Sequence, residues 1–368
     1  MTTIFEPVFE PTLTSVPHPA LAPALRPGGL RELTVARVDA ATASPVAALL
    51  GRFDEEFARD GIEVSFVERG DDALVFETGL LDTLRRHERG VRTRLVGLAW
   101  VDGGAVIIGR RSSTRHGPPA LRGSRLALPT GDADPSGVRR AAALRAYESA
   151  LGLAGLGLRD VTLVPVDGDV VAAVSAGEVD AAHLAHAPSA KVARAHRVQV
   201  LVDLDAYPDA RARVHDLGPL PITVRTDLLE AAPDVVARYL AASLDAAAWS
   251  ESHGEQFRRL VRLCDGAFPF DQLTHDVHHR LRIDLSRERL GLLAAQQRFL
   301  RRHGFVTTDL DVFDWADPAP LGSARDLLAG RRYGPCRSLR SVPPPTPRPP
   351  VPTTNVTRTG SRSRRRGS

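Results

Sequence analysis

A chain of 368 residues exceeds the usual single domain of roughly 100 to 200 residues, so we expect two domains or lobes. Hydrophobic residues make up 43% and charged residues 25% of the sequence, which is typical of an ordinary globular protein. No stretch approaches the roughly 18 consecutive apolar residues that a membrane helix needs. These features exclude a peptide, a lone binding module and a helical membrane protein.

The net charge of +4 conceals an uneven distribution along the chain. Residues 331–368 contain ten arginines and no acidic residue, so this segment carries +10 and the remainder carries −6. The segment also holds eight of the 28 prolines, a composition that cannot build a core and predicts a disordered, solvated tail. A contact between this tail and a polyanion remains an alternative, but we do not expect nucleic acid as a partner.

Cysteine usage and the start of the chain bear on its location. The two cysteines, Cys264 and Cys336, exclude a disulfide framework and a cysteine-based metal cluster. Residues 1–30 are rich in proline and show neither a basic start nor an apolar run typical of a secretory signal. We therefore expect a cytoplasmic protein, and a monomer.

Strands alternate with helices in the first part of the chain, which predicts an α/β sheet. Ser44-Pro45 indicates a helix start, because proline is favoured in the first helical turn. The apolar patterns predict strands at 33–38, 62–67, 73–76, 95–100 and 105–108, and helices at 44–59 and 80–88.

A second series of elements begins at Leu121. We expect strands at 121–131, 161–166, 177–184 and 198–204, and helices at 134–151 and 170–176. A strand at 222–225 then leads back to the first lobe, and the chain from 226 to about 304 is predicted to be helical. The predicted organisation is a leader at 1–30, the first part of lobe 1 at 31–124, lobe 2 at 125–219, a mostly helical return at 220–330 and the tail at 331–368.

Several phrases of the sequence resemble a known fold family. The similarity to the sulfonate, nitrate and taurine branch of type II periplasmic binding proteins rests on residues 121–131, 176–182 and 231–236. A closer similarity is to the aryl sulfinate desulfinases of biodesulfurisation, at residues 61–64, 92–97, 296–305 and 314–321. The resemblance covers about residues 31–328 and implies a two-lobed α/β fold of the type II periplasmic-binding-protein class, with a C-terminal helical return.

The catalytic set of those desulfinases is not retained. The resemblance places the family's nucleophilic cysteine near Thr42, and its histidine falls at Val75-Phe76. Its arginine can be matched to Arg85 or Arg86 only by assumption. The sequence shows no base beside Thr42, and a hydroxyl without a base is a far poorer nucleophile than a thiolate, so desulfination by a thiolate is not expected.

Candidate site residues follow from the position of the ligand in such proteins, at the C-terminal ends of strands. Side chains that could transfer a proton or attack a substrate are Asp39, Thr42, Glu77 and His183. Side chains and backbone that could contact a ligand are Thr78, Trp100, Thr130, Gly131 and His186.

Each candidate also has a purely structural interpretation. Thr130 to Asp134 could simply cap the next helix, the carboxylates could be solvated, and the two histidines and Trp100 could belong to the core. A further histidine group at 275–279 has spacing that can bind zinc, but the glutamate of the protease signature is absent and a surface helix is favoured. We expect no metal and no cofactor.

Two functions remain open on these grounds. The favoured one is a cytoplasmic, desulfinase-like lyase or hydrolase that acts on a small organic acid such as an aryl sulfinate or a related anion, and the missing secretory signal decides the preference. The alternative is a non-catalytic solute-binding protein that delivers a sulfonate or similar organic anion to a transporter permease. Both predict a small anionic or aromatic ligand. A ligand sensor with a basic tail is a third interpretation.

Overall fold

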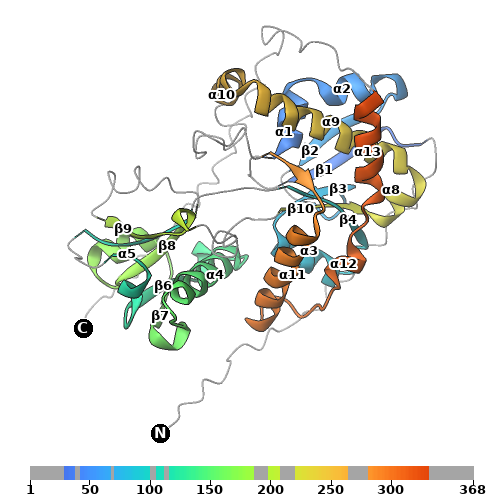
Figure 1. Cartoon of the computed structure of the whole chain (residues 1–368). Coiled ribbons are helices and arrows are strands. Elements are labelled where there is room, and N and C mark those ends of the chain that lie inside the picture. The colour runs from blue at the N-terminus through green and yellow to red at the C-terminus, as the bar shows by residue number, and fades with distance from the viewer. Residues whose placement is uncertain are drawn as a thin grey trace, which may run out of the picture.

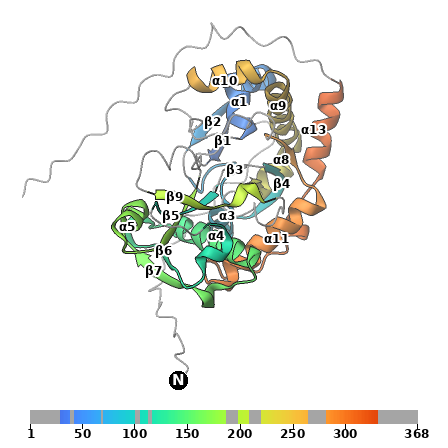
Figure 2. The same ribbon diagram turned by 60° about the vertical axis from the view of Figure 1, so that its left-hand side comes forward.

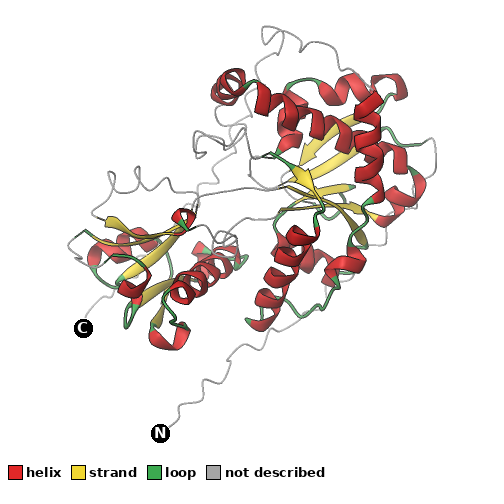
Figure 3. Ribbon diagram, viewed as in Figure 1, coloured by secondary structure: helices red, strands yellow, loops and turns green. Residues whose placement is uncertain are grey.

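The chain forms two α/β lobes, each built around one sheet (Figures 1 and 3). The computed structural model describes residues 29–37, 42–67, 70–99, 105–111, 116–185, 198–207, 220–263 and 281–330. Within these residues no helix is long and apolar enough to cross a membrane. The arrangement confirms the predicted fold class of a two-lobed α/β protein with a C-terminal helical return.

The sheet of lobe 1 has six strands in the order β11-β4-β10-β3-β1-β2. The strand β1 pairs in parallel with both β2 and β3, so the C-terminal ends of these three strands share one edge. The strand β10 enters antiparallel between β3 and β4, and β11 pairs antiparallel with β4. The strands span Glu32–Arg37 (β1), Glu63–Val67 (β2), Val75–Glu77 (β3), Thr93–Ala99 (β4), Leu220–Arg225 (β10) and Ile283–Asp284 (β11).

Helices cover both faces of this sheet because its strands are apolar on both sides. One face packs on α1 (Ala43–Leu49), α2 (Arg52–Phe57), α8 (Thr226–Ala231), α9 (Pro233–Ser252), α10 (Gly254–Leu263) and α13 (Ala319–Gly330). The other face packs on α3 (Leu80–Glu88), α11 (Arg287–Arg302) and α12 (Val312–Trp315). The strand β4 contributes to both cores, with Val96 on the first face and Leu95 on the second.

The sheet of lobe 2 has five strands in the order β7-β6-β8-β5-β9. The helix α4 (Val138–Leu153) packs on one face and α5 (Val170–Ala176) on the other. The strand β6 is parallel to β7 and β8, whereas β5 is antiparallel to β8 and β9. The strands span Ala105–Arg110 (β5), Arg125–Pro129 (β6), Thr162–Val166 (β7), Ala181–Ala185 (β8) and Val198–Asp203 (β9).

Several local predictions differ from the structure. The strand β5 belongs to the second sheet, so that sheet begins earlier in the chain than residue 125. The predicted helix 44–59 is broken at Gly51, whose φ of 71° is a left-handed conformation that ends α1 before α2 begins. The predicted helix at 134 starts only at Val138, and the predicted helical run 226–304 is interrupted by β11.

The two lobes meet through one apolar cluster. Leu84 of α3 and Phe299 of α11 come from lobe 1, whereas Leu128 of β6 and Leu144 of α4 come from lobe 2, and all four belong to the same buried cluster. Figure 2 shows α4 close to α3 and α11. This cluster holds the C-terminal edges of the two sheets near one another on the side of α3.

Polar contacts reinforce the same junction. Glu148 on α4 lies 2.8 Å from Nε2 of His303 and 2.5 Å from a guanidinium nitrogen of Arg302. A second contact runs from the Arg85 guanidinium of α3 to the carbonyl oxygen of Ser136, which precedes α4. The junction is therefore a mixed interface of leucine packing and ion pairs.

The ion pairs at Glu148 predict a pH dependence of stability. Burial raises the pKa of Glu148, but the hydrogen bond and charge of His303, together with the charges of two arginines, outweigh it and hold that pKa below its ordinary value. A carboxyl group with a lowered folded-state pKa stabilises the protein above its unfolded pKa, and this contribution is lost as the pH falls through the folded pKa.

We therefore expect Glu148→Gln to cost about 1 kcal/mol or less of unfolding free energy near neutral pH. This cost should shrink as the pH falls below 4.5, the ordinary value for the group. Urea unfolding of both proteins between about pH 7 and pH 3 measures it. The exposed Glu288→Gln is the matched control, and an equal cost of Glu148→Gln at all pH values would contradict the expectation.

Candidate functional site

The candidate site of lobe 1 lies at the shared C-terminal edge of β1 and β3. Arg37 is the last residue of β1 and is paired in register with Glu77, the last residue of β3. The helix α1 begins one residue after Thr42, so β1, β3 and the start of α1 meet at this edge. Both Arg37 and Glu77 are buried.

Three hydroxyl groups converge on the buried carboxylate of Glu77. Thr42 Oγ1 donates to Oε2 at 2.8 Å, and Ser44 Oγ donates to the same oxygen at 2.5 Å. The phenol of Tyr239, on α9, donates to Oε1 at 2.9 Å. Glu77 is 1% exposed and none of the three donors exceeds 3%, so the whole group is shielded from water. We call Thr42, Ser44, Glu77 and Tyr239 the Glu77 cluster.

Tyr239 is the member of the Glu77 cluster that lies farthest from Glu77 in the sequence. Its ring stacks on Phe53 with centroids 5.1 Å apart and planes 2° from parallel, which fixes the direction of the hydroxyl. Burial raises the pKa of Tyr239 well above its usual value, the negative charge of Glu77 raises it further, and the positive charge of Arg37 opposes the shift. The phenol is therefore a neutral hydrogen-bond donor at physiological pH.

Thr78 begins a second polar network beside the cluster. Its hydroxyl lies 3.1 Å from that of Thr83 and accepts a hydrogen bond from Arg86 at 3.3 Å. The Arg86 guanidinium also lies 4.0 Å from the centroid of the Phe76 ring and 3.2 Å from a carboxylate oxygen of Asp71. Burial lowers the pKa of Arg86, and the Asp71 charge opposes this. The network ties the end of β3 to α3.

On lobe 2, Thr130 and Gly131 follow directly after β6, at the C-terminal end of that strand. The N–H of Thr130 donates to the carbonyl oxygen of Val166, and Gly131 adopts a φ of 63°. This left-handed conformation favours glycine, and a side chain here would also displace the Asp167 carboxyl, whose carbon would lie 2.5 Å from the added atom. Thr130 is partly exposed.

The start of α4 is capped by the protein itself. The buried Asp134 carboxylate accepts the N–H groups of Arg139 at 3.1 Å and Arg140 at 2.7 Å. These are the free helical N–H groups that would otherwise attract a ligand anion. An anionic ligand at this helix would therefore have to lie beside an existing carboxylate, and the capping interpretation of residues 130–134 is the one that the geometry favours.

His183 is the middle residue of β8, which runs parallel to β6 and pairs with it at Leu126 and Ala181. Its backbone N–H donates to the Tyr147 hydroxyl at 3.0 Å, and that hydroxyl donates to the carbonyl oxygen of Ala127 at 2.6 Å. Burial raises the pKa of Tyr147 far above its usual value, against the hydrogen bond from His183. The imidazole is 8% exposed. His183 is thus anchored between β8 and α4 by a neutral tyrosine.

Of the predicted residues, Thr42 and Glu77 are in direct contact, and Thr78 follows Glu77. Thr130 and Gly131 lie on the other lobe, directly after β6, and His183 lies in the middle of the neighbouring β8. The remaining candidates, Asp39, Trp100 and His186, and the histidines at 275, 278 and 279 lie outside the described residues. In the part of the chain that the structure describes, no three potential ligands are grouped to hold a metal ion.

The sequence did not reveal Arg37, Ser44 or Tyr239 as site residues. Ser44 was interpreted only as a helix start, and Arg37 as part of a strand. Tyr239 is separated from Glu77 by 162 residues and lies on a helix whose other buried residues are apolar apart from Ser243 and Ser250. The only available signal was a tyrosine on a buried stripe, because a buried phenol requires a polar partner.

Comparison with known proteins identifies the architecture. No protein-family model matches the sequence, and no curated protein matches it. The structure is similar to a mutant of the desulfurization enzyme DszB in complex with biphenyl-2-sulfinic acid, with a TM-score of 0.63 and 21% identity over 81% of this chain and all of that one.

Two sulfonate-binding proteins have TM-scores in the same range. A putative periplasmic sulfonate-binding protein from Methylobacillus flagellatus has a TM-score of 0.64 and 18% identity, over 82% of this chain and 95% of that one. The aliphatic sulphonate binding protein of Escherichia coli has a TM-score of 0.58 and 17% identity, over 78% and 92% of the two chains. These likenesses show that the chain has the same two-lobed fold as these proteins.

Proposed function

We propose that the chain binds a small organic acid between the C-terminal edges of its two sheets. The observation that carries the proposal is the Glu77 cluster, a buried polar network placed where open α/β sheets bind their ligands. The structurally similar proteins support the ligand class, since one holds biphenyl-2-sulfinic acid and two are sulfonate-binding proteins.

The charges at the lobe 1 edge are compatible with an acidic ligand. Glu77 alone would repel an anion, but the positive charge of Arg37 lies at the paired position of the neighbouring strand. On the other lobe, the partly exposed Thr130 presents a hydroxyl that can donate to a ligand oxygen. The ligand would therefore be held by the Thr130 hydroxyl and the charge of Arg37, since the hydroxyls of the Glu77 cluster already donate to Glu77.

Binding without turnover is the function that this geometry favours. Glu77 already accepts three hydrogen bonds from hydroxyl groups, which leaves its oxygens little capacity to take a proton from a substrate. The location and assembly of such a protein, whether cytoplasmic, monomeric or paired with a transporter permease, stay predictions from the sequence.

A desulfinase-like enzyme is the second candidate, favoured by one specific observation. Thr42 stands at the position that the resemblance assigns to the family's nucleophile, and its hydroxyl lies 2.8 Å from Glu77. A hydroxyl beside a carboxylate is the arrangement of a nucleophile and its base. The sequence alone had shown no such base near Thr42.

A thermal-shift screen of the full chain tests the proposal. The panel contains aryl and aliphatic sulfinates, sulfonates and carboxylates, and mass spectrometry follows each mixture for turnover. A ligand at about 100 times its dissociation constant should add roughly 2.7 kcal/mol to the unfolding free energy. We expect at least one organic acid to stabilise the protein and to be recovered unchanged.

Two matched variants locate the site and separate the candidates. Thr130→Val should weaken the stabilisation by the ligand, whereas Thr162→Val, an exposed threonine on the neighbouring β7, should leave it unchanged. Consumption of a ligand that stops in Thr42→Val would establish the enzyme instead. If no acid in the panel shifts the melting temperature, the proposal is wrong.

A further inference from the structure

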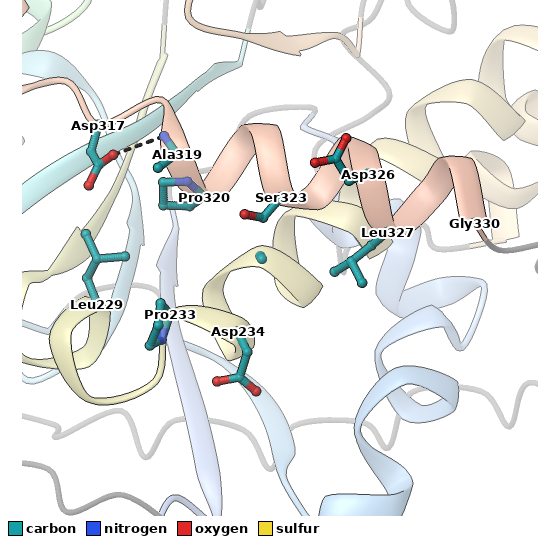
Figure 4. Close-up of a pocket in the computed structure, with 11 residues that line it drawn as sticks. Leu229, Pro233, Asp234, Asp317, Ala319, Pro320, Ser323, Asp326, Leu327 and Gly330 are labelled. Atoms are coloured by element: carbon teal, nitrogen blue, oxygen red, sulfur yellow. Dashed lines mark hydrogen bonds between the residues drawn. The ribbon is translucent and has the colours of Figure 1, made fainter.

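A groove of about 900 Å³ lies on lobe 1, away from the candidate site. Figure 4 shows its two walls, α13 on one side and the end of α8 with the start of α9 on the other. The walls are largely apolar, with Leu229 and Pro233 facing Pro320 and Leu327 across the groove. Every residue that lines it belongs to lobe 1.

The charged side chains at this groove are all acidic. Asp234, Asp317 and Asp326 line it, and its lining contains no lysine, arginine or histidine. The Asp234 side chain is 72% exposed, and its contact with Arg238 is a long one of 4.0 Å. An occupant that fits this surface combines apolar groups with positive charge.

We propose that the arginine- and proline-rich segment 331–368 of this same chain binds in the groove through its proline run at residues 343–350. Gly330 is both the last residue of α13 and a lining residue, so the chain continues directly from one end of the groove. The segment contains ten arginines, eight prolines and no acidic residue, which complements the three aspartates. Segments of such composition are disordered in isolation and order on binding.

The length of the segment fits the groove. The helix α13 has 12 residues, which corresponds to a wall of about 18 Å. An extended polyproline chain spans that distance with about six residues. Six prolines fall within the eight residues 343–350, and the 12 residues between Gly330 and Pro343 are sufficient to reverse the direction of the chain.

Tethering favours this occupant over a separate protein. A short flexible connection gives the segment an effective concentration on the order of millimolar at the groove. Proline restricts the unbound backbone, so less conformational entropy is lost on binding than for an ordinary chain. Arginine side chains can bind the rim carboxylates while the proline rings pack on the leucine and proline side chains of the walls.

Limited trypsin digestion of the full chain tests the proposal. Cleavage after Arg337 and Arg340 is followed by mass spectrometry and compared with a free peptide of residues 328–352. Cleavage after Arg358, beyond the proline run, is the internal reference. In about 50 mM salt we expect the two nearer bonds to be cut about tenfold more slowly in the chain than in the peptide. Both bonds lie in the 12-residue connection, which is closed into a loop while residues 343–350 are bound, and trypsin needs an extended chain that only release from the groove provides.

Two double variants identify the surface. Asp234→Asn/Asp326→Asn should bring cleavage to within about twofold of the free peptide, as should about 0.5 M salt. Asp54→Asn/Asp72→Asn removes the same charge from exposed positions outside the groove and should leave the protection intact. Circular dichroism confirms that both variants remain folded.

Three outcomes would overturn the proposal. The first is cleavage as fast in the chain as in the peptide. The second is protection that the groove variant leaves unchanged. The third is protection that rises with protein concentration, which would assign the groove to the tail of a second copy.

Discussion

Replacing Glu77 by alanine is expected to cost about 3–5 kcal/mol of unfolding free energy, the range observed when one partner of a buried charged network is removed. The substitution leaves the hydroxyls of Thr42, Ser44 and Tyr239 without their shared acceptor in a site that water does not reach. It also leaves the charge of the buried Arg37 without the opposite charge at its paired position. Urea unfolding followed by circular dichroism measures the loss.

Glu77→Gln removes the negative charge but nearly keeps the shape of the side chain, so it separates the contribution of charge to stability from that of packing. The amide keeps one acceptor oxygen but turns a donor toward hydroxyls that themselves donate, so we expect a smaller loss of about 1–3 kcal/mol. Glu63→Gln, at an exposed position on β2, is the matched control and should change stability by less than about 0.5 kcal/mol. A loss for Glu77→Ala no greater than that of the control would show that the Glu77 cluster does not hold the edge together.

Local patterns in the sequence were sufficient to predict both sheets and the helices between them. These patterns can be recognised within one short segment alone. Examples are the alternating apolar residues at 33–38 and 62–67 and the Gly177 turn into 181–184. The assignment of β5 to lobe 1 was wrong because the sheet that a strand joins depends on contacts with segments far away in the sequence. A short apolar run does not show which sheet it joins, and β5 is placed by its pairing with β8 and β9, at Ile107 with His183 and Val202.

The site was predictable only in part for the same reason. The expectation that polar residues at strand ends meet at one edge correctly brought Thr42 and Glu77 together. Tyr239 was missed because its contact spans 162 residues and depends on how α9 crosses the sheet. The role of Asp134 was ambiguous from sequence, since a carboxylate before a helix can cap it or bind a ligand, and only the hydrogen bonds to the N–H groups of Arg139 and Arg140 distinguish the two.

The junction between the lobes carries the second large expected effect. Leu144 of α4 is 5% exposed and belongs to the apolar cluster that both lobes share. Its replacement by alanine should cost about 2–5 kcal/mol, the usual range for a buried leucine. Because the cavity opens at the contact with α3 and α11, we also expect the two lobes to become less coupled.

Hydrogen exchange measured by mass spectrometry distinguishes this uncoupling from simple destabilisation. Leu126→Ala is the matched control, because Leu126 is fully buried in a cluster confined to lobe 2. Under mild conditions Leu144→Ala should speed exchange in α11, on the opposite lobe, whereas Leu126→Ala should act mainly on its own sheet. Equal acceleration of α11 by both substitutions would mean that the lobes unfold as one unit. Selective acceleration would show that the contact between α4 and α11 couples the two lobes.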